Sequence, residues 1–147
     1  MKFNSTSTFV LCVFLFGLVG CASTAPRPEP SLYDRLGGKP AISAVVNDFI
    51  DIVGTDDRIN AKPAEAKVPA VKLFLTDFVC QATGGPCVYR GRSMRQIHAG
   101  MKIADAEFDA VVGDLVKTLD KYKVPEREKG ELLALLGPLR PDIVEVP

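Results

Sequence analysis

The chain has 147 residues, with 18 Lys or Arg against 18 Asp or Glu, so its formal net charge is zero. This length suits one domain and excludes a large multidomain enzyme, and the balanced charge offers no basic excess for binding nucleic acid. The one histidine, His98, excludes metal sites built from two or three histidines. Any chemistry that needs an imidazole therefore depends on this residue.

The N-terminal residues read as a targeting segment. An apolar run over residues 9–19 is shorter than the roughly 20 residues of a membrane-spanning helix and is typical of a secretory signal. Residues 18–21 read Leu-Val-Gly-Cys, which resembles a bacterial lipobox, so we expect cleavage before Cys21 and lipidation of its thiol. An ordinary signal peptide with an incidental cysteine is the alternative.

The domain boundaries follow from this segment. We expect a lipoprotein signal peptide over 1–20, the lipidated cysteine and a Pro-rich extended tether over 21–30, and the folded domain over 31–147. Ala22 follows the cysteine, which resembles lipoproteins sent to the outer membrane. The expected location is the bacterial cell envelope, where the lipid holds the protein on the outer membrane, facing the periplasm.

Two cysteines, Cys80 and Cys87, remain in the folded domain. An even pair in an exported domain predicts a disulfide, which here would close a short loop through the Gly-Gly-Pro at 84–86. Two free thiols are the alternative. The spacing differs from that of a CxxC redox motif, and two cysteines with one histidine do not make a zinc site.

Apolar residues of the folded domain recur at helical spacing, and no stretch alternates as a strand would, which predicts an all-α domain. Six helical pieces are expected, over residues 32–36, 40–53, 68–82, 93–101, 105–119 and 125–136. Ser93 and Asp105 are suited to cap the fourth and fifth pieces. The last piece is expected to end at Gly137 and to bury Leu132, Leu133, Leu135 and Leu136.

A series of motifs runs through this domain. It comprises Leu-Tyr-x-x-Leu-Gly-Gly at 32–38, Phe49, Asp-x-Ile at 57–59, Gly-Gly-Pro at 84–86, Tyr-x-Gly-Arg-x-Met-Arg-x-x-His at 89–98 and Phe-Asp-Ala-Val at 108–111. Together these motifs resemble the group I truncated hemoglobins over residues 31–137. The resemblance implies a truncated globin with a two-over-two helical sandwich, a haem b cofactor and a diatomic ligand (O₂, NO or CO) at its iron.

Taken alone, one histidine beside Ile97 and Met101 is more often structural than a metal ligand. The resemblance makes His98 the expected proximal ligand of the haem iron, with its other ring nitrogen bonded to a carbonyl or carboxylate. It also implies a haem pocket lined by Phe49, Ile50, Val71, Phe74, Leu75, Phe78, Met94, Met101, Phe108 and Val112. Tyr89, Arg92 and Arg95 would bind the haem carboxylates, or else form solvated surface.

The matched distal positions depart from the family pattern. Ile50 stands where the family often has tyrosine, and Val71 and Leu75 stand where it often has glutamine. Lys62-Pro63 occupies the place of an aromatic residue that usually packs on the haem. A hydrogen bond from a distal donor to bound O₂ is worth about 1.5–3 kcal/mol, so its absence predicts fast release of O₂.

Three functions remain open at this point. The first is a monomeric globin that carries or senses a diatomic gas. The second is an enzyme that converts O₂ and NO to nitrate, which would need an electron-donor protein because the chain has no flavin or nicotinamide motif. The third is a globin-like lipoprotein without haem that acts through a protein partner.

Overall fold

The structure is a computed structural model that describes residues 29–59 and 68–146. Its helices are α1 (Leu32–Arg35), α2 (Gly38–Val53), α3 (Val68–Ala82), α4 (Met94–His98), α5 (Asp105–Lys121), α6 (Glu126–Leu136), the 3-10 helix η1 (Gly137–Leu139) and α7 (Arg140–Ile143). Within these two ranges there is no strand, which confirms the all-α prediction. The predicted signal peptide, Cys21 and Lys62-Pro63 lie outside the described residues.

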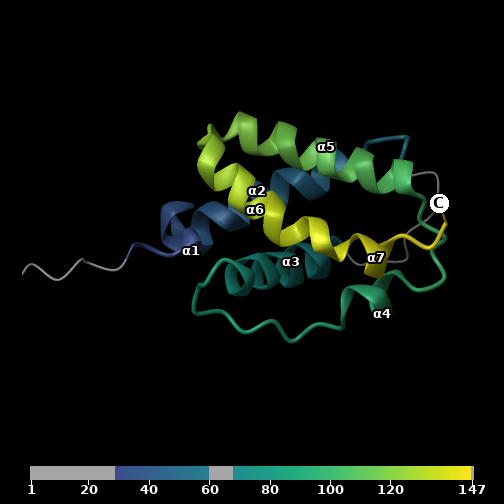
Figure 1. Cartoon of the computed structure of the whole chain (residues 1–147), viewed down its shortest axis with the longest axis horizontal. Coiled ribbons are helices and arrows are strands. Elements are labelled where there is room, and N and C mark those ends of the chain that lie inside the picture. Colours follow the sequence, from purple (N-terminus) through teal and green to yellow (C-terminus); the bar gives the residue numbers. More distant parts are fainter. Residues whose placement is uncertain (1–28, 60–67, 147) are drawn as a thin grey trace, which may run out of the picture.

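Helix α2 is central to the packing of the long helices. Helix α2 packs against both α3 and α5, and α1 packs against α6. Figure 1 shows α5 along one side of the molecule and α3 along the other, with α2 and α6 between them. None of the helices in the described part of the chain is long and apolar enough to cross a membrane.

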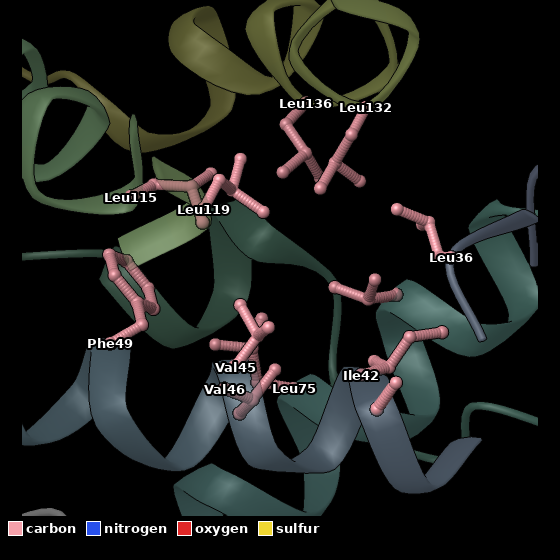
Figure 2. Close-up of a pocket in the computed structure, with 12 residues that line it drawn as sticks. Leu36, Ile42, Val45, Val46, Phe49, Leu75, Leu115, Leu119, Leu132 and Leu136 are labelled. Carbon is pink, nitrogen blue, oxygen red and sulfur yellow. The ribbon is translucent and has the colours of Figure 1, made fainter. Parts of the chain in front are cut away.

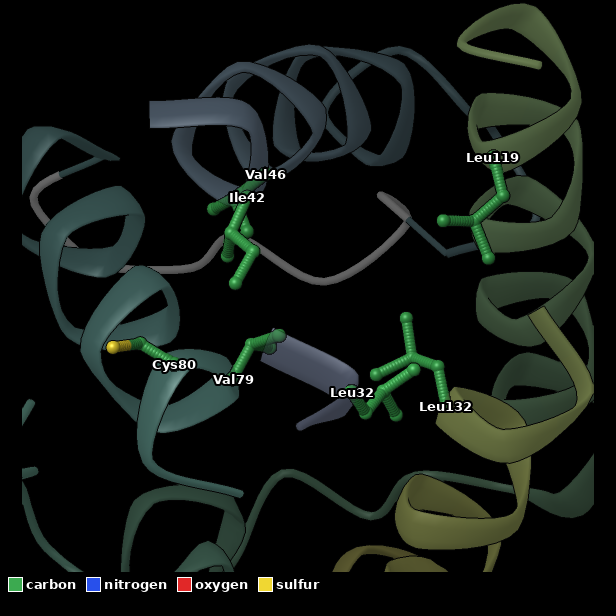
Figure 3. Close-up of a cluster of buried hydrophobic side chains, with 7 residues drawn as sticks. All are labelled: Leu32, Ile42, Val46, Val79, Cys80, Leu119 and Leu132. Atoms are coloured by element: carbon green, nitrogen blue, oxygen red, sulfur yellow. The ribbon is translucent and has the colours of Figure 1, made fainter. Parts of the chain in front are cut away.

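The core joins five helices. Its buried side chains come from the apolar stripes that the sequence pattern predicts and from Cys80, and in Figure 3 all of them except Cys80, whose sulfur points away, point toward one another. They are Leu32, Ile42, Val46, Val79, Cys80, Leu119 and Leu132. Because burial of these stripes removes apolar area from water, it stabilises the packing of α1, α2, α3, α5 and α6 around one centre.

One predicted helix cap is confirmed and one is wrong. The Ser93 hydroxyl accepts a hydrogen bond from the Gln96 backbone N–H at 3.3 Å, and the Gln96 side chain accepts from the Ser93 N–H at 3.1 Å. Asp105 does not cap α5, because it is already the first helical residue and Ala104 occupies the cap position. There the Glu107 carboxylate accepts the Ala104 N–H at 2.7 Å, so the acid three residues along satisfies the helix start.

The last predicted helix ends where the sequence predicts, at Leu136 before Gly137, although further helical turns follow it. Gly137 takes right-handed helical angles (φ −52°, ψ −43°) instead of the left-handed conformation that ends a helix. Pro138 then lies in the first turn of η1, where its missing N–H breaks no helical hydrogen bond. The chain therefore continues into α7, and Leu135, expected to be buried, is 43% exposed.

The loop after α3 packs closely on α1. Cys80 and Cys87 are joined by a disulfide across this loop. Gly84 has φ +86°, and a Cβ on Gly85 would lie 2.4 Å from a ring carbon of Tyr33. Both positions therefore require glycine, one for its backbone conformation and one for the close approach of the aromatic ring. This loop leads directly to the segment that carries His98.

Candidate functional site

His98 is the last residue of α4 and is partly buried. Its Nδ1 lies 2.8 Å from the carbonyl oxygen of Met94, one helical turn earlier. Because a carbonyl oxygen accepts but does not donate, the neutral form of the ring in this contact carries its proton on Nδ1 and its available lone pair on Nε2. A neutral imidazole with Nε2 available is the donor that haem iron takes in globins, so the residues present fit this group.

Tyr89 ties the segment before α4 to the face of α3. Its ring lies edge-on to Phe78 at a centroid distance of 5.3 Å and to Phe74 at 6.4 Å. Its hydroxyl donates to the Arg92 carbonyl at 2.7 Å, and its backbone N–H donates to the Gln81 side chain at 2.7 Å. The structure therefore brings three of the predicted site residues together and uses the Tyr89 hydroxyl within its own loop.

Two predicted distal residues, Phe49 and Leu75, line an apolar cavity of about 60 Å³. Figure 2 shows their side chains pointing into it from α2 and α3. Its remaining lining residues are Leu36, Ala41, Ile42, Val45, Val46, Val79, Leu115, Leu119, Leu132 and Leu136. His98 does not line this cavity, whose lining residues come mainly from α2, α3, α5 and α6. No lining side chain can donate a hydrogen bond.

The other predicted distal residues do not line this cavity. Ile50 and Phe78 pack against the buried core, Val71 is partly buried, and Phe74 is 44% exposed. Helix α3 carries a hydroxyl at Thr76, which is buried and donates to the Lys72 carbonyl at 2.7 Å. That bond keeps the hydroxyl on its own helix, so α3 presents an apolar surface on this side.

The predicted cationic residues differ in their contacts. Arg92 is exposed. Arg95, also exposed, donates from Nε at 3.0 Å and from Nη2 at 2.6 Å to one carboxylate oxygen of Asp142. A partner from α7 therefore already occupies the guanidinium that the sequence suggests for a haem carboxylate.

The remaining predicted pocket residues lie on α4, α5 and the turn between them. Met94 and Val112 are partly buried, Met101 is 37% exposed, and Phe108 is buried. The Arg140 guanidinium covers the Phe108 ring, 4.4 Å from its centroid. Contacts from α7 and the residues after it therefore reach both α4 and the start of α5.

One residue of this region, Glu145, is missed by sequence reasoning. Its carboxylate accepts the backbone N–H groups of Gly100 at 2.8 Å and Lys102 at 2.6 Å, directly after His98. These two N–H groups lower the pKa of the Glu145 carboxyl below its ordinary value. A lone acidic residue near the end of the chain carries no periodic or motif signal, so no pattern in the sequence could have found this contact.

Comparisons with known proteins identify the family of this chain. The family model described as bacterial-like globin matches residues 31–145. A group 1 truncated hemoglobin of Mycolicibacterium paratuberculosis is 34% identical over 118 residues, covering 80% of this chain and 87% of that protein. The chain belongs to the group 1 truncated hemoglobins. A group 1 truncated hemoglobin from Synechocystis is also 34% identical, over 111 residues that cover 73% of this chain and 90% of that protein.

A solved structure confirms the truncated-hemoglobin fold. The Fe(III) form of the truncated hemoglobin from Tetrahymena pyriformis superposes with a TM-score of 0.74 at 29% identity, covering 78% of this chain and 98% of that one. The family, the helical fold and the haem cofactor predicted from the sequence are thereby confirmed. As a globin, the protein binds haem and small gas ligands.

Proposed function

We propose that this truncated hemoglobin binds a diatomic gas at a haem held by His98, and that it releases O₂ quickly. The observation that carries the proposal is the contact of 2.8 Å between His98 Nδ1 and the Met94 carbonyl. When bound, the haem supplies an iron atom with one coordination position for the protein and one for the gas. The proposal further assigns an apolar distal wall to α2 and α3.

The proximal residues orient the ligand nitrogen. The Met94 carbonyl holds the proton on Nδ1, sets the plane of the ring and increases the basicity of Nε2. Ser93 supports this arrangement because its capping contacts with Gln96 fix the first turn of the short helix that carries both Met94 and His98. The histidine is therefore oriented before any ligand arrives.

The distal side chains exclude water and offer no hydrogen bond to the gas. Phe49 and Leu75 contribute only carbon to the cavity that they line, and the Thr76 hydroxyl is bonded to its own helix. A charge-assisted hydrogen bond is worth about 1.5–3 kcal/mol, so a wall without one releases O₂ roughly 10- to 150-fold faster than a wall with one. NO and CO depend less on such a bond.

The envelope location remains part of the proposal. A disulfide between Cys80 and Cys87 suits an oxidising compartment, in agreement with the lipobox that ends at Cys21. We expect Cys21→Ala to move the full chain from the membrane fraction to the soluble fraction and to abolish labelling by a radioactive fatty acid. Unchanged membrane attachment of this variant would contradict lipidation at Cys21.

The haem assignment is tested with the full-length chain in detergent, titrated with hemin and then reduced. We expect one haem per chain and the absorption spectrum of a five-coordinate, histidine-ligated ferrous haem. His98→Gly should lose this spectrum and regain it with added imidazole, whereas the exposed Arg90→Ala control should retain it. A folded, helical chain that takes up no haem would instead favour the haem-free function with a protein partner.

A further inference from the structure

The C-terminal strap, which we define as residues 140–146, lies against the segment that carries His98. Helix α7 of this strap packs against α4, and Figure 1 shows the two side by side. The Asp142 carboxylate accepts two hydrogen bonds from Arg95 on α4. The backbone N–H groups of Glu145 and Val146 donate to the Ile103 carbonyl at 2.9 and 3.1 Å. The strap is thus bonded on both sides of His98.

Between these two attachments the Glu145 carboxylate holds the turn that follows His98. The turn begins with a hydrogen bond of 3.0 Å from the Met101 N–H to the His98 carbonyl. One oxygen of Glu145 accepts the Gly100 N–H at 2.8 Å, and the other accepts the Lys102 N–H at 2.6 Å. Each carboxylate oxygen therefore fixes a different residue of the same turn.

This turn has a backbone conformation that needs support. Gly100 has φ +81° and Lys102 has φ +53°. A left-handed conformation is unfavourable for a residue with a Cβ, so Lys102 would leave it unless other contacts hold the backbone in place. The shorter of the two Glu145 contacts is made to the N–H of Lys102 itself. The carboxylate thus stabilises the residue of the turn that most needs it.

We propose that Glu145 is a positioning residue for the proximal side of the haem site: by holding the turn at Gly100 and Lys102, it sets the orientation of the His98 imidazole. This inference rests on the proposed ligation of the iron by His98. If the turn relaxes, the end of α4 rotates and the ring leaves the orientation that its contact with the Met94 carbonyl defines. The iron–histidine bond then weakens, and the haem is lost more easily.

Two substitutions remove the acceptors of Glu145 to different extents. Glu145→Ala removes both acceptors. Glu145→Gln keeps the shape of the side chain but replaces one acceptor oxygen with an NH₂ group, which cannot accept a backbone N–H. The backbone bonds to Ile103 and the contacts of Asp142 remain in both variants, so the strap stays attached.

A matched control comes from the other end of the domain. Asp34 also uses its carboxylate to accept a backbone N–H, that of Ser31 at 3.2 Å, at the start of α1. Asp34→Ala therefore removes the same kind of contact from a helix that packs mainly against α2 and α6. It measures how far a general loss of stability changes the haem site.

The experiment uses the haem-loaded, full-length protein in detergent. We expect Glu145→Ala to shift and broaden the iron–histidine stretching band of the ferrous form in resonance Raman spectra, and to increase the rate of haem transfer to excess apomyoglobin about 10-fold. Glu145→Gln should give a smaller change in the same direction, and Asp34→Ala should leave the band in place. Amide exchange at Gly100 and Lys102, measured by NMR, should accelerate in both Glu145 variants.

The outcomes distinguish the role of Glu145 from the proposed ligation of the iron by His98. A wild-type band that His98→Gly abolishes, but that both Glu145 variants leave unchanged, would overturn the role of Glu145 alone. A wild-type protein with no such band would overturn the proposed ligation by His98 and this inference with it. Should Glu145→Ala fail to fold, the near-isosteric Glu145→Gln still decides the matter, because unchanged amide exchange and an unchanged band would refute the proposal.

Discussion

The apolar distal wall predicts a large effect of adding a single hydrogen-bond donor. Leu75 is partly buried on α3 and lines the cavity of about 60 Å³ together with Phe49. Leu75→Gln places an amide there, and because every lining side chain is apolar, the amide N–H has no competing acceptor on that wall. Its bond to O₂ should contribute about 1.5–3 kcal/mol, which slows O₂ dissociation roughly 10- to 150-fold.

The assay is stopped-flow displacement of O₂ by excess CO from the ferrous full-length protein. Leu75→Met is the matched control, because it keeps the volume and the apolar character of leucine but adds no N–H. It should release O₂ within about threefold of the wild type, since it changes packing only. Dissociation of CO should change far less than that of O₂ in Leu75→Gln. Equal O₂ rates in the Gln and Met variants would refute the view that this wall faces the gas and lacks a donor.

Three further predictions concern stability. The double variant Cys80→Ala/Cys87→Ala opens a loop with a sequence separation of 7, and loop entropy predicts a loss of about 2.4 kcal/mol in urea unfolding. Leu119→Ala, at a site 1% exposed, should cost about 3–5 kcal/mol by the same measurement, and a loss below that of an exposed leucine would contradict its place in the core. The Lys121 ammonium holds the pKa of Asp48 below its ordinary value. Asp48→Asn should therefore be destabilising at neutral pH, and its difference from the wild type should shrink as the pH falls through the lowered pKa.

Local patterns predicted the long helices well, for a physical reason. The apolar stripes of α2, α3 and α5 each bury one face, and that requirement shows in the spacing of their residues. The cap at Ser93 could also be predicted from the sequence, because its partner, Gln96, lies three residues away. The end of α6 before Gly137 was predicted correctly, but the helical turns of η1 and α7 that follow were not, because Gly137 keeps right-handed helical angles.

The site was predictable only in part. Residue spacing alone left His98 a weak candidate, and the resemblance to a family was what assigned it to the iron. Its bond to Met94 follows from helical geometry, since residues four apart lie one turn apart. The contacts of Glu145 with Gly100 and Lys102 span more than forty positions, and nothing local to either segment encodes them.

In the proposed haem site, the two sides differ in polarity. On the proximal side, polar contacts from Met94, Ser93 and Glu145 fix the histidine and the backbone around it. On the distal side, Phe49 and Leu75 supply surface without polar groups. A gas that depends on a distal hydrogen bond would gain nothing from that wall, and the strength of the bond to iron, which the proximal contacts tune, would contribute to the affinity for every gas. Changes at Glu145 should therefore alter the binding of O₂, NO and CO together, whereas a donor introduced at Leu75 should separate O₂ from CO.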